Sequence, residues 1–174
     1  MDLILKPRTL TVLCTPHAGR DEAALLAAEL ALNGPVTVLD GGNRFAAFRL
    51  MQHLRLHLPD PASAARRVFV RRAFTCYQMQ ALLDATPSRP QPHILLDLLA
   101  TFYDENVPLP EAHRLLESCL CQVERLSLAG PLLVTLSPPP SSERACLVEE
   151  VCALAGCLYI TESSIRPTLQ PVLF

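Results

Sequence analysis

The sequence has few charged and few aromatic residues. Only 18% of its 174 residues are Asp, Glu, Lys or Arg, 5% are aromatic, and half are apolar. Intrinsically disordered chains combine low hydrophobicity with high net charge, so this composition excludes a disordered chain and indicates a well-buried sheet. The formal net charge of -2 lacks the basic excess that marks an independent nucleic-acid-binding domain.

Long apolar runs are also missing. The apolar start, MDLILKPRTL, is far too short for a secretory signal peptide, and no run approaches the roughly 20 apolar residues of a membrane helix. We therefore expect a soluble cytoplasmic protein, or a nuclear one in a eukaryote, with no membrane partner. The length predicts a single domain over residues 1–174.

Cysteine, by contrast, is frequent in this sequence. There are seven, an odd number in a chain without an export signal, so we expect reduced and mostly buried thiols rather than a disulfide framework. Cys119 and Cys121 lack zinc-finger spacing and have no second Cys/His pair nearby. No metal site is predicted from them.

Strand-like apolar runs alternate with helix-like segments along the chain. This alternation predicts βαβ units and a mostly parallel sheet with helices on both faces, a three-layer αβα fold. The strands are expected at 10–14, 36–40, 68–70, 93–99, 131–136 and 157–161, with a seventh at 168–173. The helices are expected at 21–33, 44–58, 76–84, 111–128 and 141–155, the last starting at Ser142.

The loop after the first expected strand stands where nucleoside triphosphatases carry G-x-x-x-x-G-K-[ST]. Residues 14–21 read Cys-Thr-Pro-His-Ala-Gly-Arg-Asp. Of the motif only Gly19 remains, while Arg20 takes the lysine position and Asp21 the hydroxyl position. A helix N-terminus still follows Gly19 and favours anions, so weak phosphate or nucleotide binding assisted by Arg20 is one hypothesis. The alternative is that Asp21 caps the helix and nothing binds.

Two further carboxylates are expected at the same edge of the sheet. Ligands of open parallel sheets bind at the carboxyl ends of the strands. Asp40 ends the second expected strand and is followed by Gly41, Gly42 and Asn43. Asp97 follows an apolar run in HILLD, a pattern that holds Mg²⁺ in phosphate-loop enzymes. An aspartate that only caps the next loop explains the same pattern equally well.

Four segments together resemble a known family. VTVLDGGNRFAAFRLMQHLR, VFVRRAFTCYQMQALLDA, HILLDLLATFYDE and PLLVTLSPP follow the order and spacing of the RecA/Rad51/RadA recombinase core, over residues 10–136. The resemblance implies a RecA-like P-loop NTPase fold. It also implies a vestigial nucleotide site, whose residues would be Gly19, Arg20, Asp21, Asp40 and Asp97.

The departures from that family concern its chemistry. Cys14 stands at the first glycine, Pro16 removes a backbone N–H, and the position of the water-activating glutamate falls at Gly42. Phosphoryl transfer depends on positioning and charge stabilisation, so we expect no catalytic residues and no cofactor, or at most weak ATP with Mg²⁺.

The resemblance therefore implies a non-catalytic accessory or scaffold protein of DNA recombination or repair. Such a protein docks on a protein partner, for example a RecA-like ATPase. One alternative is an ATPase with an atypical loop that relies on Arg20 and Asp97. Another is a RecA-like fold used for an unrelated scaffold task.

Arg71 and Arg72 are the candidate DNA contacts. They are adjacent on an expected strand, so their side chains point to opposite faces, and a solvated sheet end is the alternative. The loops that would correspond to the DNA-binding loops of recombinases, 100–110 and 137–142, are neither basic nor glycine-rich. We therefore expect DNA binding to be weak or indirect.

Overall fold

The computed structural model describes residues 3 and 5–161. The seventh expected strand, 168–173, lies outside the described residues. Six strands form one parallel sheet in the order β3-β2-β4-β5-β1-β6. The strands are β1 (Leu10–Cys14), β2 (Val36–Asp40), β3 (Val68–Arg72), β4 (His93–Leu96), β5 (Leu132–Leu136) and β6 (Cys157–Ile160).

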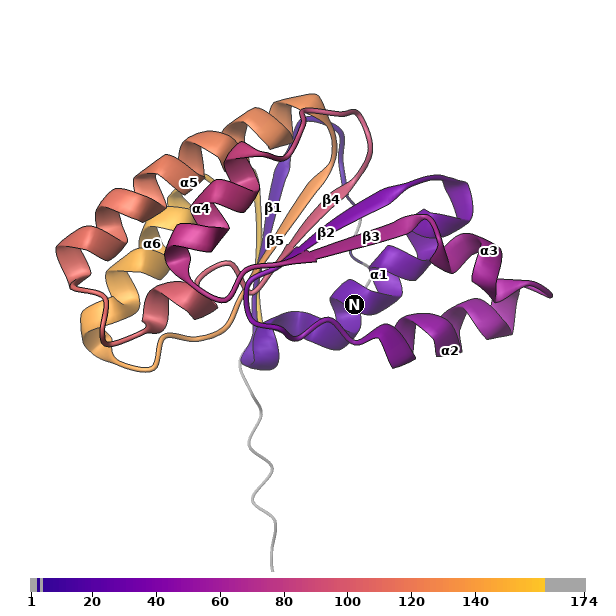
Figure 1. The fold of residues 1–174 in the computed structure, drawn as a ribbon, viewed down its shortest axis with the longest axis horizontal. Helices are drawn as coiled ribbons and strands as arrows, with labels where there is room; N and C mark the ends of the chain where they lie inside the picture. Colours follow the sequence, from indigo (N-terminus) through magenta and orange to yellow (C-terminus); the bar gives the residue numbers. More distant parts are fainter. Residues whose placement is uncertain (1–2, 4, 162–174) are drawn as a thin grey trace, which may run out of the picture.

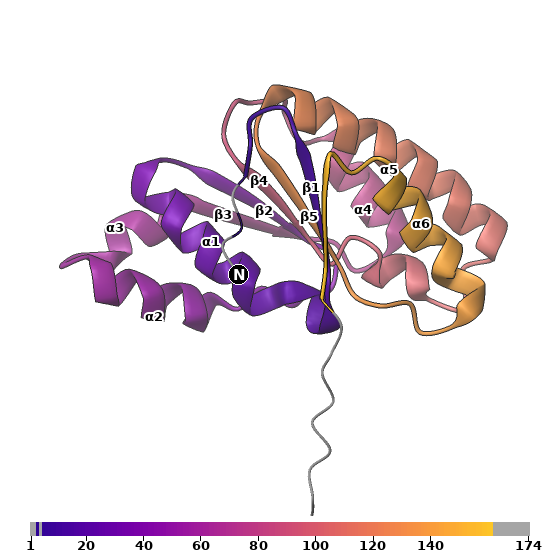
Figure 2. The same cartoon turned by 180° about the vertical axis from the view of Figure 1, so that it is seen from behind.

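Helices cover both faces of the sheet, which confirms the three-layer α/β fold. One layer holds α1, α2 and α3, and the opposite layer holds α4, α5 and α6 (Figure 1, and from behind in Figure 2). The helices are α1 (Arg20–Asn33), α2 (Ala47–His57), α3 (Pro61–Ala65), α4 (Cys76–Asp84), α5 (Leu109–Ala129) and α6 (Ala145–Ala153).

The burial of the strands explains their unbroken apolar sequences. Every residue of β2 and β5 is buried, because each face of the sheet is covered by a helix layer. Alternate strand residues enter two separate cores. Val12 and Val134 pack with α5, while Val38 and Ile94 pack with α1.

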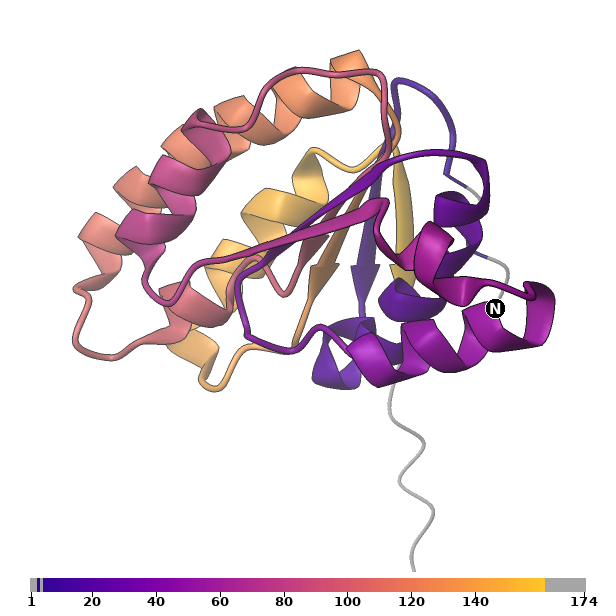
Figure 3. The same cartoon turned by 45° about the vertical axis from the view of Figure 1, so that its right-hand side comes forward.

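The chain reverses direction across the sheet between the two layers. From β1 it passes through α1 to β2, which lies beyond β5 and β4, and then to β3 at the edge. It returns through α4, α5 and α6 on the other face. The strand ends near such a reversal are where open parallel sheets bind ligands. In Figure 3 the arrowheads of β1 and β5 lie at the lower edge, next to the loop that follows β1.

Several boundaries differ from those expected. β4 ends at Leu96 rather than at residue 99, because Asp97 has a φ of 52° and leaves the sheet. Helix α2 begins at Ala47 rather than at residue 44. Helix α6 begins at Ala145 after a 3₁₀ turn, Ser142–Arg144, so Ser142 does not cap it. The short helix α3 was not expected.

The cysteines are all unpaired, but the expectation that most are buried was wrong. Only Cys76 and Cys119 are buried, Cys121 is exposed, and the other four are half-buried. Cys14 is the last residue of β1, Cys157 lies on the edge strand β6, and Cys121, Cys146 and Cys152 lie on the outer helices α5 and α6, where side chains are only partly covered. Within the described part of the chain, no helix is long and apolar enough to cross a membrane.

Candidate functional site

Three loops meet at the carboxyl edge of the sheet. They follow β1, β2 and β4, and they bring the five sequence-predicted site residues into one region. Arg20 and Asp21, at the start of α1 after the first loop, and Gly42, Asn43 and Arg44 from the second loop line a common open groove of about 840 Å³. A second groove of about 640 Å³, on the other side of Arg44, reaches Ser137.

The loop after β1 winds into a left-handed turn. His17, Ala18 and Gly19 have φ values of 57°, 54° and 55°. A left-handed conformation costs roughly 1–2 kcal/mol for a residue with a side chain. Gly19 is required for a second reason, because a Cβ there would lie 2.7 Å from Leu13 Cδ2. The turn is therefore fixed by packing against β1.

The N-terminus of α1 already carries protein carboxylates. Gly19 is the N-cap residue and no side chain caps the helix, so the hypothesis that Asp21 is the cap was wrong. Asp21 instead pairs with Arg49 of α2 at 3.5 Å and with Arg20 at 3.6 Å. Asp21 and Glu22 occupy the first turn, where their charges complement the helix dipole in place of a bound anion.

Asp40 is a fully buried carboxylate that organises the second loop. Its Oδ1 and Oδ2 accept hydrogen bonds from the backbone N–H groups of Arg44 and Phe45, both at 3.0 Å. Arg72 Nε lies 3.5 Å from Oδ2. These bonds hold residues 44–46 outside the helix, which is why α2 starts later than expected. The Asp40 carboxylate therefore stabilises the second loop.

Asp97 is buried just as completely. Its Oδ1 accepts hydrogen bonds from the backbone N–H and the hydroxyl of Ser137, at 3.1 and 2.8 Å. Arg44 Nε lies 2.7 Å from Oδ2, but neither atom completes a hydrogen bond. The contact is therefore an ion pair, and the charge of Asp97 is balanced from within the protein.

The glycines after Asp40 allow this close approach. A Cβ at Gly42 would lie 2.8 Å from Asp97 Oδ2 and 3.0 Å from Arg44 Nε. A Cβ at Gly41 would lie 2.7 Å from the Asp97 carbonyl oxygen. Real Cβ contacts are not that short, so both glycines are needed for the second loop to lie against Asp97.

Arg44 and Ser137 are the residues that sequence reasoning missed. Arg44 touches both carboxylates, with its backbone N–H on Asp40 and its guanidinium on Asp97. Its only sequence signal is its position four residues after Asp40. Nothing in the sequence pairs it with Asp97, which is 53 positions away. A divalent cation at Asp97 Oδ2 would have to displace this guanidinium.

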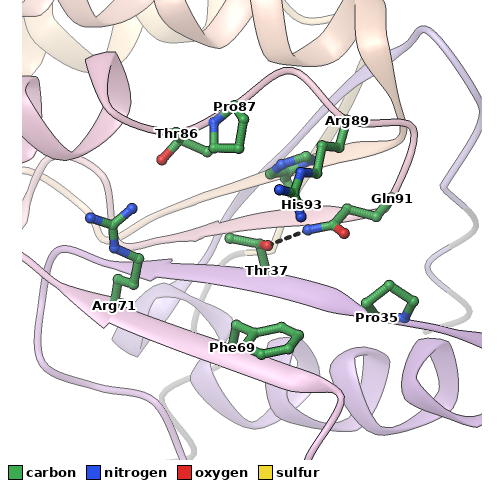
Figure 4. Close-up of a pocket in the computed structure, with 9 residues that line it drawn as sticks. All are labelled: Pro35, Thr37, Phe69, Arg71, Thr86, Pro87, Arg89, Gln91 and His93. Atoms are coloured by element: carbon green, nitrogen blue, oxygen red, sulfur yellow. Dashed lines mark hydrogen bonds between the residues drawn. The ribbon is translucent and has the colours of Figure 1, made fainter.

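Arg71 and Arg72 point to opposite faces, as their adjacency predicts. Arg72 belongs to the carboxyl-edge site through its ion pair with Asp40. Arg71 lies beside Phe69 over a hollow of about 360 Å³ (Figure 4). The two arginines therefore do not form one patch, and their assignment as joint DNA contacts stays a prediction with less support.

The same hollow is lined by one polar side chain without a hydrogen-bond partner and by two that are hydrogen-bonded to each other. Its floor includes His93, which is 1% exposed and whose Nδ1 has no hydrogen-bond partner. Burial lowers the pKa of His93, so the imidazole is neutral at pH 7. Beside it the Gln91 side-chain amide donates to Thr37 Oγ1 at 2.6 Å (Figure 4).

No protein-family model matches this chain, and no curated protein matches it either. Among the described residues, no group of three or more His, Cys, Asp or Glu side chains is placed to hold a metal ion. Functional assignment therefore rests on the geometry of the carboxyl edge.

Proposed function

We propose that this protein is a non-catalytic accessory or scaffold protein with a RecA/Rad51-like core, which acts in DNA recombination or repair through a protein partner. The observation that carries the proposal is the ion pair between Arg44 and Asp97. In the resemblance to recombinases Asp97 stands at the Mg²⁺-holding position. Here the Arg44 guanidinium balances the charge of that carboxylate at Oδ2, and Ser137 donates two hydrogen bonds to Oδ1.

The other residues at the carboxyl edge of the sheet also lack the groups that phosphoryl transfer needs, which supports a scaffold role. Catalysis of phosphoryl transfer needs donors and cations aimed at the charge that develops in the transition state. The first loop offers no lysine, the first turn of α1 carries Asp21 and Glu22, and Gly42 takes the place of a general base. The buried carboxylates instead stabilise the loops around them.

The α1–α2 surface provides a docking face for a partner. Phe48 and Leu56 lie two turns apart on α2, on one face of that helix, and their side chains are 69% and 83% exposed. Leu25 of α1 adds a further exposed apolar side chain beside a hollow that also contacts Leu56. Exposed large apolar side chains grouped on one surface are typical of protein interaction sites.

Nucleotide binding is the first test. The purified protein is heated with millimolar ATP and Mg²⁺, and binding is measured in parallel by calorimetry. A scaffold with Asp97 engaged by Arg44 should show no rise in melting temperature. Saturable binding with a micromolar Kd would contradict the non-catalytic proposal.

Partner binding is the second test. The chain is mixed with a purified RecA-family ATPase from the same organism, and complex formation is followed by size-exclusion chromatography. We expect a complex that Phe48→Ser with Leu56→Ser abolishes. Tyr77→Ser is the matched control, because Tyr77 is also exposed but lies on α4, in the opposite layer. A complex that only the Tyr77 variant disrupts would overturn this choice of face.

ATP binding by an atypical site is the second candidate function. It is favoured by the three arginines, Arg20, Arg44 and Arg49, that line the 840 Å³ groove at the start of α1. Arginine clusters bind phosphate groups. In that case Arg20→Ala and Asp97→Ala should each weaken Mg²⁺-dependent binding, whereas Arg55→Ala, which alters an exposed arginine outside that groove, should not.

A further inference from the structure

The layer formed by α5 and α6 carries a cluster that the carboxyl-edge site does not use. Cys146, in the first turn of α6, has its Sγ 3.5 Å from His113 Nε2 of α5. The other ring nitrogen of His113, Nδ1, is 2.5 Å from Glu150 Oε1. Cys146 and Glu150 are four residues apart on α6 and so share one face of that helix.

The order of contacts is that of an activated nucleophile. A thiol, an imidazole and a carboxylate lie in line, with the carboxylate at one ring nitrogen and the sulfur at the other. Because the Glu150 carboxylate can only accept, it fixes the proton on Nδ1 and leaves Nε2 free to take the thiol proton. His113 acts on the reacting sulfur directly, and Glu150 is a positioning residue.

The site is open to small reagents. The side chains of His113 and Glu150 are 33% and 31% exposed, and Cys146 is half-buried. In the resting protein the thiol also donates a hydrogen bond to the carbonyl oxygen of Glu143 at 3.3 Å, so its proton has to turn to His113 before transfer. Cys146 stands in the first turn of the nine-residue helix α6, at the end where the backbone N–H groups point.

Most of the other cysteines lack these advantages. Burial raises the pKa of Cys14, Cys76 and Cys152, and it raises the pKa of Cys119 to about 12. Cys121 is exposed on α5, and among the described residues its thiol makes no hydrogen bond to a base. Accessibility and a neighbouring base therefore coincide at Cys146.

We propose that Cys146 is a nucleophilic thiol and a site of reversible modification by small disulfides. His113 Nε2 takes the thiol proton as Sγ attacks one sulfur of the disulfide. The new S–S bond forms as the old one breaks, and the second sulfur leaves as a thiolate that recovers the proton from His113. The disulfide is itself the oxidant, so the exchange needs no other reagent. The inference does not depend on the function proposed for the carboxyl edge.

The test uses the full-length protein, with oxidised glutathione and iodoacetamide as probes. Modification of each cysteine at pH 7 is timed by peptide mass spectrometry. We expect Cys146 to react about ten-fold faster than Cys121, since a positioned base raises thiol reactivity. His113→Gln should reduce the Cys146 rate to near that of Cys121, with an unchanged melting temperature.

Two further readouts separate activation from simple exposure. At pH 9 the advantage of Cys146 should shrink, because thiols ionise there without a base. Glu150→Gln should give an intermediate rate and shift the pH profile of the reaction, and Glu150→Asp should restore part of it. Equal rates at Cys146 and Cys121 in the native protein would overturn the proposal, as would a His113→Gln protein that reacts like the native one.

Discussion

The loops after β1 and β2 leave the same edge of one sheet, yet their carboxylates are used in opposite ways. Where the first loop enters α1, Asp21 is part-exposed and meets two exposed arginines at 3.5–3.6 Å. Where β2 enters the second loop, Asp40 is fully buried, accepts two backbone hydrogen bonds and has an arginine beside it. Asp97 extends this second, buried network.

The difference shows where this edge is rigid. A buried charge is tolerated only when it is paired and hydrogen-bonded, so Asp40 and Asp97 fix the positions of the groups around them. An exposed ion pair is screened by water and contributes little. The second loop is therefore the structural centre of the site, although the first carries the motif-like sequence.

Asp97→Ala should have the largest effect. It leaves Arg44 and the Ser137 backbone N–H without their buried partner, so the free energy of unfolding should fall by about 3 kcal/mol. Urea denaturation measures the change. Asp21→Ala is the matched control and should stay within about 0.5 kcal/mol of the native protein. Equal losses in the two variants would remove the distinction between the loops.

Gly42→Ala should give the second-largest loss of stability. The added methyl group would press on Asp97 Oδ2 and on Arg44, and overpacking of this kind costs about 1–3 kcal/mol. Gly34→Ala is the control, since a Cβ there would meet nothing within 4 Å and the backbone at Gly34 is extended. Denaturant midpoints compare the two, and a Gly42→Ala protein as stable as Gly34→Ala would count against the close packing.

His93 is a buried ionisable group without a counter-charge, so it can be compared with the paired carboxylates Asp40 and Asp97. Its pKa is lowered by burial, so the unfolded chain takes up a proton near pH 6.5 that the folded protein does not. Stability should be full above about pH 6.5 and should fall as the pH drops through that value. Melting temperatures from pH 8 to pH 5 report this, and His93→Gln should flatten the decline. His57→Gln, at an exposed histidine on α2, should leave it unchanged.

His17→Gly should have the smallest effect and the opposite sign. It relieves a left-handed conformation in the first loop, and after the entropic cost of glycine the gain should be about 0.5 kcal/mol. Arg20→Gly, one residue inside α1 where φ is -57°, should instead lose about 0.5–1 kcal/mol. Both are read from urea denaturation, and a loss in the His17 variant would mean that the turn needs that side chain.

The pattern of apolar runs was sufficient to predict the architecture. Strands such as β2 and β5 have continuous apolar sequences because both faces of the sheet are buried. Element boundaries were less predictable where a side chain rather than the local sequence sets them. Asp40 delays the start of α2 through its bonds to Arg44 and Phe45, and the left-handed Asp97 ends β4 early.

The sequence by itself determined that helices and strands alternate, that the sheet is parallel, and that Asp40, Asp97 and the degenerate first loop lie at strand ends. Those features follow from local periodicity and from the direction of parallel strands. Only the tertiary structure decided that Arg44 pairs with Asp97, that Arg72 turns to Asp40 while Arg71 does not, and that His113 lies between Cys146 and Glu150. Such pairings join residues from different elements, and their partners are set by how the layers pack.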